Sequence, residues 1–347
     1  MNAPNSGIAF EIAERFARRA LSEVPSPVQR LGQLEAELGG GVEIYIKRDD
    51  LLRSLHGNKL RYIEYVLGAY REAGADCLIH CGGQASNYMA QLAMVGAAEG
   101  IPTYLVLLGE RPAFPQGNAL IADVFGAHVR YLPGSFGGSC SEHKNTLASE
   151  LRATGRNPYV VDYPFSNHAG ILGYIRAYLE IQEQIASGAV PPIDHIFLCS
   201  GGNSYLGMRI AADLCGDTVG ITAFPPLYWE ESGLGGIAPD LTTFLLKKVR
   251  EFGGFAGCSL PTTVIDCDEQ FVGEGYGIPT VGSMEAVRLL ARLEGVLLDP
   301  IYSGKAMAGL LARLRAGNIA AGRRLLFVHT GGMINVFNHH TKLSGSR

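Results

Sequence analysis

Short segments with β-strand composition alternate with longer segments of helical periodicity along most of this chain. The predicted strands are 42–47, 77–81, 103–108, 128–132, 159–161, 195–199, 219–223 and 325–329. Between them, apolar residues recur at helical spacing, as along 60–70 and 170–187. This alternation is typical of parallel sheets that are buried between helices on both faces. We therefore expect an α/β protein with mostly parallel sheets.

The length of the chain predicts two lobes. It has 347 residues, of which 47% are hydrophobic, whereas a single domain usually has about 50–250 residues. The glycine-rich stretch 134–139 and the connection 162–170 are plausible boundary regions. We predict a smaller domain over 60–165, a larger domain formed by 1–59 and 166–347, and an active site in the cleft between them.

Composition argues against several classes of partner. The net charge of −4 provides no basic surface for nucleic acid. No apolar run reaches the roughly 18 residues of a membrane span, and the N-terminus lacks the pattern of a secretory signal. The seven cysteines show no CxxC spacing, and His339-His340 has no nearby carboxylate or cysteine partner, so neither a disulfide framework nor a metal site is expected. These features favour a cytoplasmic protein.

Three glycine-containing turns each follow a predicted strand and precede a helical pattern: 80–87, 199–207 and 329–333. Ligands bind at the carboxyl ends of strands in parallel sheets. The second turn, Ser200-Gly201-Gly202-Asn203-Ser204, suits a phosphate because backbone N–H groups and hydroxyls meet at a helix start. No Walker lysine follows it, so a nucleotide P-loop is poorly supported.

Two other interpretations of glycine and serine patterns are weaker. A hydrolase nucleophile at Ser204 would need G-x-S-x-G, and the final glycine is missing. The stretch 233–238 approximates a dinucleotide-binding fingerprint but does not follow a clear strand.

Lys59 follows a Gly-Asn pair and stands at the head of a predicted helix. A phosphate-binding turn together with a separate lysine suggests pyridoxal 5′-phosphate, whose aldehyde forms a Schiff base with a lysine amine. The positive end of the helix dipole would help to lower the pKa of that amine. A solvated lysine at a helix start is the alternative on local grounds.

The chain resembles the 1-aminocyclopropane-1-carboxylate (ACC) deaminase/D-cysteine desulfhydrase family of fold-type II pyridoxal-phosphate enzymes. The matching stretches are PSPVQRL (25–31), IKRDDL (46–51), GNKLRYIEY (57–65), GGQASN (82–87), SGGNSYLG (200–207), GEGYGIPT (273–280), LDPIYSGKAM (298–307) and FVHTGG (327–332). Eight ordered matches from residue 25 to residue 332 make the resemblance specific. It implies a two-lobed, three-layer αβα fold like that of the tryptophan synthase β subunit, and a homodimer.

The resemblance also implies roles for individual residues. Lys59 matches the Schiff-base lysine, which also moves protons at the substrate Cα, and Asn87 matches the asparagine at the cofactor's 3′-oxygen. Ser86 corresponds to a serine near the substrate carboxylate and Cα. Tyr302 matches a tyrosine against the pyridine ring and Tyr276 a second active-site tyrosine. The remaining implied cofactor contacts are Ser200, Gly201, Gly202, Asn203, Ser204, Ser303 and Thr330.

The cyclopropane-cleaving members of the family that this chain resembles carry glutamate directly after the ring-stacking tyrosine. This chain has Ser303 at that position. A carboxylate there keeps the pyridine nitrogen protonated, whereas a neutral hydroxyl can donate to an unprotonated nitrogen. Ser303 resembles the desulfhydrase branch and predicts a weaker electron sink that disfavours cyclopropane opening.

The residues that are expected to contact the substrate also differ from the family pattern. Ala85 and Tyr88 flank Ser86-Asn87 where the family pattern has glutamine before and histidine or glutamine after, and Tyr62 replaces a usual lysine or arginine. Loss of a hydrogen-bond donor to a charged group costs roughly 1.5–3 kcal/mol, enough to redirect specificity. We predict that the part of the site that binds the cofactor matches the family pattern, whereas the part that binds the substrate has diverged from it. His80, Cys81 and Cys199 end buried strands, so packing is their expected role, with substrate contact as the alternative for His80 and Cys81. The Asp49-Asp50 pair is expected to brace the lysine-bearing segment or neighbouring backbone.

The resulting prediction is a lyase that acts on a small amino acid with a leaving group at Cβ. D-Cysteine, yielding pyruvate, sulfide and ammonium, is the leading substrate. The alternatives are β- or γ-replacement, a specialised elimination or cyclisation, ACC deaminase activity, and a binder that kept the cofactor pocket without chemistry.

Overall fold

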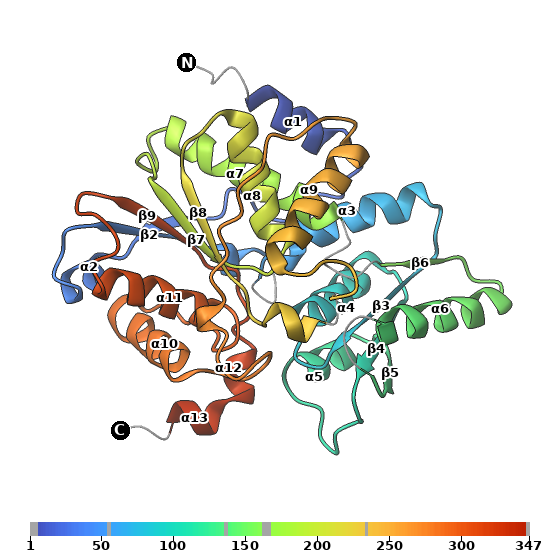
Figure 1. Ribbon diagram of the computed structural model, residues 1–347. Helices are drawn as coiled ribbons and strands as arrows, with labels where there is room; N and C mark the ends of the chain where they lie inside the picture. The colour runs from blue at the N-terminus through green and yellow to red at the C-terminus, as the bar shows by residue number, and fades with distance from the viewer. Residues whose placement is uncertain (1–5, 54–56, 135–137, 162–167, 233–234, 345–347) are drawn as a thin grey trace.

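The computed structural model describes residues 6–53, 57–134, 138–161, 168–232 and 235–344, and Figure 1 shows their arrangement. Two separate sheets, drawn to the left and right in Figure 1, form the framework of the molecule. Both are flanked by helices, as the alternating pattern predicts.

The larger sheet has five strands in the order β1-β2-β9-β7-β8. They are β1 (Val28–Arg30), β2 (Glu43–Lys47), β9 (Arg324–Val328), β7 (His195–Cys199) and β8 (Gly220–Phe224). All neighbours pair in parallel except β1, which runs antiparallel to β2. The sequence did not predict β1, because three half-exposed or exposed residues at a sheet edge carry no apolar alternation.

The smaller sheet has four parallel strands in the order β5-β4-β3-β6. They are β3 (Cys77–Gly83), β4 (Thr103–Leu108), β5 (His128–Leu132) and β6 (Pro158–Val160). The predicted strands therefore agree with the structure to within about two residues at each end. All four lie inside the range predicted for the smaller domain, while the domain boundaries themselves stay a prediction.

Helices cover both faces of the larger sheet. The core on one face includes residues of α1 (Ser6–Glu14), α3 (Lys59–Glu72), α7 (His168–Ala186), α8 (Asn203–Cys215) and α9 (Leu241–Ala256), and the core on the other includes residues of α2 (Gly32–Glu37), α10 (Val281–Glu294) and α11 (Ser303–Arg315). Alternate residues of β7 divide between these cores: Ile196 and Leu198 join the first and Phe197 and Cys199 the second. The strands are thus buried on both faces, which confirms the three-layer prediction.

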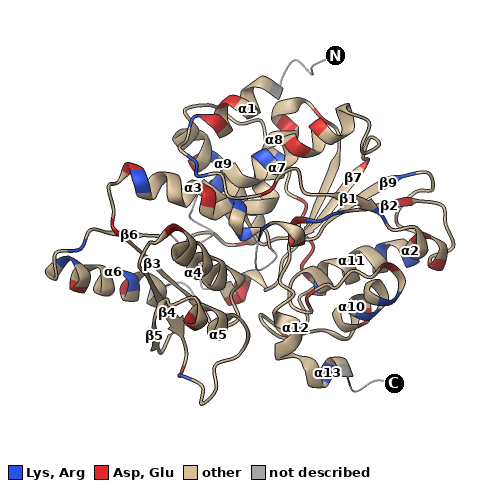
Figure 2. Cartoon of the chain, turned by 180° about the vertical axis from the view of Figure 1, so that it is seen from behind, with Lys and Arg blue, Asp and Glu red and all other residues tan. Residues whose placement is uncertain are grey.

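The smaller sheet is covered in the same way. Its helices are α4 (Asn87–Glu99), α5 (Gly117–Val124) and α6 (Gly138–Ala153). α6 contacts the face formed by Cys77, Ile79 and Cys81, and α4 packs on the opposite face. Figure 2 shows α4 free of charge along almost its whole length, in agreement with the burial of residues 88–96. The remaining short elements are η1 (Asp49–Leu51), η2 (Trp229–Ser232), η3 (Glu269–Phe271), α12 (Asn335–Asn338) and α13 (His340–Ser344).

The predicted glycine turns lie at the carboxyl ends of β3, β7 and β9, where they lead into α4, α8 and α12. In the part of the chain that the structure describes, no helix is long and apolar enough to cross a membrane.

Candidate active site

Lys59 is the first residue of α3, and tertiary contacts fix its position. Gly57 forms an antiparallel bridge with Gly331, and the Asn58 N–H donates to the Thr330 carbonyl at 3.1 Å. A Cβ at Gly57 would lie at an ordinary 3.5 Å from the Thr330 carbonyl oxygen but 2.6 Å from the side-chain nitrogen of Gln91, which would have to move. The start of α3 is thereby tied to the turn that follows β9.

The Lys59 amine lies 4.7 Å from the centroid of the Tyr62 ring and lines a cavity between the two sheets. Burial lowers the pKa of Lys59 to about 8. The direction is the one predicted from the sequence, although desolvation is the leading cause. A lysine with this pKa has a substantial fraction of neutral, nucleophilic amine near pH 7 to 8.

A buried ion network holds the first turn of α3. The Arg61 guanidinium bonds Asp49 at 2.7 Å and 2.9 Å and Glu180 at 3.0 Å, and the Tyr174 hydroxyl donates to the same aspartate at 3.2 Å. Glu180 also accepts from Lys47. The Arg61 guanidinium, together with other partners, keeps the pKa of the Asp49 carboxyl below its usual range despite complete burial. The predicted bracing role of Asp49 is confirmed.

The turn after β7 forms a compact cradle at the start of α8. The Ser200 hydroxyl accepts N–H bonds from Gly202 and Tyr205, both at 3.1 Å, and a bond from the Ser204 hydroxyl at 2.9 Å. Asn203 and Ser204 occupy the first turn of the helix, where backbone N–H groups have no intrahelical acceptor. These donors and the helix dipole fit a phosphate group. The residues present therefore suit the phosphate of pyridoxal phosphate.

Two tyrosines form the wall on the side of the larger sheet. The hydroxyl oxygens of Tyr276 and Tyr302 lie 2.5 Å apart, and the rings meet at 66° with centroids 6.1 Å apart. Burial raises the pKa of both phenols above the ordinary value. Each hydroxyl is therefore neutral at pH 7 and able to hold or pass a proton within the pair.

Asp299 was not singled out from the sequence, yet it organises the start of α11. Its carboxylate accepts N–H bonds from Ile301, Tyr302 and Ser303, and the Ser303 hydroxyl donates to it at 2.8 Å. Burial raises the pKa of Asp299 to about 6. The Ser303 hydroxyl also accepts the Asp299 N–H at 2.9 Å, so it both donates to and accepts from Asp299. The predicted donation from Ser303 to a pyridine nitrogen stays a prediction.

The wall on the smaller sheet is built by the turn after β3. Ser86 caps α4 without a side-chain capping bond, so its hydroxyl is available beside the first N–H groups of that helix. Asn118 holds this turn from behind: its amide donates at 2.8 Å both to the Ala85 carbonyl and to the Asn87 side chain. The Tyr88 ring packs against His80 with centroids 4.7 Å apart and the ring planes tilted by 46°.

The cavity gathers most of the residues predicted for the site. It is lined by Lys59, Ser86, Tyr88, Ser200, Gly201, Gly202, Asn203, Ser204, Tyr276 and Tyr302. Ala85, Asn87, Ser303 and Thr330 are not part of its lining, and their expected contacts with cofactor or substrate stay predictions. The cavity also includes His80, Cys81 and Cys199, for which packing was expected, and Pro226 and Leu227 after β8. Their positions near the carboxyl ends of strands were the sequence feature that could have identified them as part of the site.

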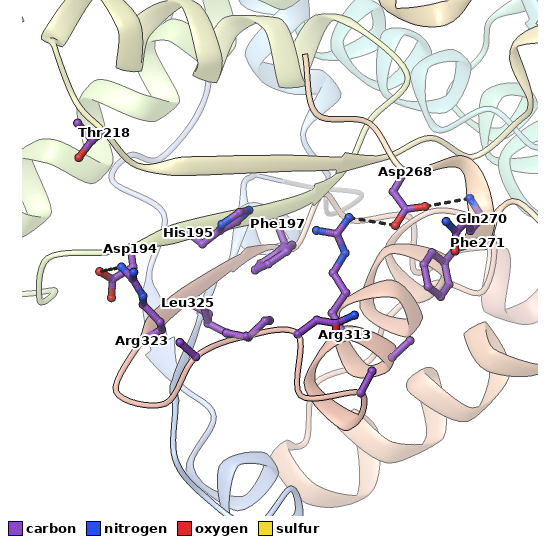
Figure 3. Close-up of a pocket in the computed structure, with 15 residues that line it drawn as sticks. Asp194, His195, Phe197, Thr218, Asp268, Gln270, Phe271, Arg313, Arg323 and Leu325 are labelled. Atoms are coloured by element: carbon purple, nitrogen blue, oxygen red, sulfur yellow. Dashed lines mark hydrogen bonds and ion pairs between the residues drawn. The ribbon is translucent and has the colours of Figure 1, made fainter. Parts of the chain in front are cut away.

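A larger hollow of about 880 Å³, against about 130 Å³ for the active-site cavity, lies at the amino ends of β7 and β9 (Figure 3). Its charged side chains pair with one another: Arg313 bonds Asp268 and Arg323 bonds Asp194, both at 3.0 Å. Lys59 and the phosphate cradle lie at the opposite strand ends. The volume of a cavity therefore does not identify the candidate active site in this protein.

Comparisons with known proteins agree with this geometry. The family model described as "Pyridoxal-phosphate dependent enzyme" matches residues 20–224 and 238–331. A 1-aminocyclopropane-1-carboxylate deaminase of Burkholderia ambifaria is 33% identical over 92% of this chain and 95% of its own length. A 1-aminocyclopropane-1-carboxylate deaminase of Burkholderia multivorans is also 33% identical, again over 92% of this chain and 95% of its own length.

Solved structures show the same fold. The crystal structure of an ACC deaminase homologue has a TM-score of 0.85 at 28% identity and covers 97% of this chain and 98% of its own. Threonine deaminase isoform 2 of Solanum lycopersicum, at 18% identity and a TM-score of 0.65 over 99% of this chain and 89% of its own, shares the fold. The chain therefore belongs to the pyridoxal-phosphate-dependent enzymes of fold type II, in the family that contains the ACC deaminases.

Proposed function

We propose that this enzyme is a lyase that eliminates the β-substituent of a small amino acid, with D-cysteine as the leading substrate. The products are pyruvate, hydrogen sulfide and ammonia, with one water consumed. The observation that carries the proposal is the Lys59 amine, with a pKa of about 8, in one cavity with a phosphate cradle and a pair of hydrogen-bonded tyrosines.

Pyridoxal phosphate, when bound, supplies an electron-accepting ring that stabilises negative charge at the substrate Cα. The cradle of residues 200–204 would hold its phosphate, and Lys59 would bond its aldehyde carbon. The Lys59 amine would also be the base that removes the substrate Cα proton. A lysine pKa near 8 suits this role because about half of such a base is unprotonated at pH 8, far more than for a lysine with the ordinary pKa of 10.5.

The smaller-sheet wall would orient the substrate. The Ser86 hydroxyl and the N–H groups at the start of α4 suit a carboxylate, because both are donors and the helix dipole favours negative charge. The phenols of Tyr276 and Tyr302 can pass a proton to the departing sulfur, which leaves more readily as a protonated group. A buried cavity limits the access of water to these steps.

ACC deamination is the second candidate, because the curated relatives at 33% identity carry that name. Asp299 supports it, since it provides a buried carboxylate one hydrogen bond away from Ser303, the position that carries glutamate in the cyclopropane-cleaving pattern. β-Replacement and a cofactor binder without turnover remain as further alternatives. We also propose a cytoplasmic homodimer with a small amino acid as its ligand.

The test is a product assay on the purified, cofactor-loaded enzyme. D- and L-amino acids with β leaving groups should release pyruvate, and D-cysteine should also release sulfide. Release of 2-oxobutyrate from 1-aminocyclopropane-1-carboxylate, without pyruvate from any β-substituted amino acid, would replace the first candidate with the second. Consumption of substrate only when a second nucleophile is added would indicate replacement chemistry.

A further inference from the structure

His80 is the central residue of β3, and it is only 2% exposed although it lines the active-site cavity. The proposed reaction assigns it no task. The sequence predicted packing as the main role of this residue, with contact to the substrate as the alternative. Its hydrogen bond and its neighbours, however, determine whether its ring can donate or accept a hydrogen bond in the cavity.

The tautomer of His80 follows from one contact. Its Nδ1 lies 3.1 Å from the carbonyl oxygen of Val161. A carbonyl oxygen only accepts, so Nδ1 carries a proton. The Lys144 ammonium donates to the same oxygen at 2.9 Å, which places a cation beside the imidazole.

The charge state follows from the surroundings. Burial, assisted by the nearby Lys144 cation, lowers the pKa of His80 to about 3, so the ring is neutral at physiological pH. A neutral imidazole with its proton on Nδ1 has a lone pair on Nε2. The Tyr88 ring packs against the imidazole at a tilt of 46°, with ring centroids 4.7 Å apart, and restrains it in this orientation.

The other residues that line the cavity explain why the Nε2 acceptor of His80 matters for ligand recognition. Among the described residues that line the cavity, none is Asp, Glu or Arg, and Lys59 is the single amine. The hydroxyls of Ser86 and of the tyrosines can donate, whereas Nε2 of His80 can only accept. Apart from the turn at 200–204, the other walls consist of uncharged groups: tyrosine rings, the Cys81 and Cys199 thiols, Gly82, Pro226 and Leu227. Such a site suits a neutral substituent that carries a hydrogen-bond donor.

We propose that His80 determines side-chain specificity: its Nε2 accepts a hydrogen bond from the β-thiol or β-hydroxyl of the amino acid. The inference rests on the proposed function, because it takes the substrate to be a β-substituted amino acid in this cavity. Anionic substituents find no partner cation besides Lys59, and substituents without a donor leave the buried Nε2 unpaired. An unpaired buried acceptor is penalised, so the site discriminates by the presence of the donor.

The experiment measures binding to the cofactor-loaded enzyme, so it does not depend on turnover. Serine and alanine, in whichever configuration binds, are titrated while the absorbance of the bound cofactor is followed. The two ligands differ by the β-hydroxyl alone. Wild-type enzyme should bind serine more tightly than alanine, by about tenfold for one neutral hydrogen bond.

Two variants separate recognition from packing. His80→Asn keeps an N–H for the Val161 carbonyl and lacks an acceptor at the Nε2 position, so the serine preference should disappear. His80→Gln can present its side-chain oxygen near that position, so it should keep most of the preference. Thermal unfolding of both variants shows whether each is folded.

Equal serine and alanine affinities in the wild-type enzyme, or an unchanged preference in a folded His80→Asn variant, would overturn the assignment of His80. The proposed elimination fails by a different result, namely no keto acid from any β-substituted amino acid. A serine preference that depends on His80 in an enzyme without eliminase activity would refute the proposed function and leave the role of His80 standing.

Discussion

The phenol oxygens of Tyr276 and Tyr302 lie 2.5 Å apart, although the residues are 26 positions apart in the sequence and precede different helices. Tyr302 is positioned by the bonds of its N–H to the Asp299 carboxylate at 3.1 Å and 3.2 Å. Both rings line the cavity that contains Lys59. The pair is therefore a neutral hydrogen-bonding unit held beside the reacting lysine.

Tyr302→Phe and Tyr276→Phe should each reduce kcat by about 10²–10⁴-fold, the usual contribution of a positioned proton donor or acceptor. The phenyl rings keep the packing, so cofactor absorbance should be retained. Turnover with D-cysteine and absorbance spectra provide the measurement. Full kcat in both variants would exclude the pair from proton transfer.

Lys59→Ala should abolish both turnover and the visible-edge absorbance of the bound cofactor, because no other amine lines the cavity among the described residues. Lys342→Ala, at an exposed position on α13, is the control and should change neither property. Spectra and keto acid release are measured on both variants. Persistent turnover in the Lys59 variant would show that another group carries the chemistry.

The reaction of the cofactor-free protein with pyridoxal phosphate should depend on pH through Lys59. Its pKa of about 8 lies below the usual lysine value of 10.5, so the neutral amine fraction rises as the pH rises through 8 and saturates above it. The rate of absorbance gain should follow this curve between pH 6 and 10. An Nα-acetyl-lysine amide solution is the reference, and its rate should still increase beyond pH 9. A protein curve identical to that reference would contradict the lowered pKa.

Arg61→Met should lower the free energy of unfolding by about 3–5 kcal/mol, because it leaves two buried carboxylates without their shared cation. Those carboxylates are Asp49 and Glu180, which bond Arg61 at 2.7 Å and 3.0 Å. Arg315→Met removes an exposed pair with Glu285 and should cost about 0–1 kcal/mol. Urea unfolding compares the two, and equal losses would show that burial of the network is unimportant.

The sequence determined the elements and the chemistry of the part of the site that binds the cofactor. Apolar periodicity and glycine turns are local features, so they predicted eight of the strands, the helix that begins at Lys59 and the phosphate cradle at 200–204. The ordered motifs added the family and hence the cofactor. Each of these signals depends on residues that are close together in the chain.

Tertiary structure alone decided the rest. β1 forms because β2 offers it an antiparallel edge, Ser303 turns its proton to Asp299, and the Nδ1 proton of His80 is set by Val161, 81 residues away. Hydrogen-bond partners from distant segments and the degree of desolvation determine tautomers and pKa values, and neither quantity exists until the two sheets and their helices have packed.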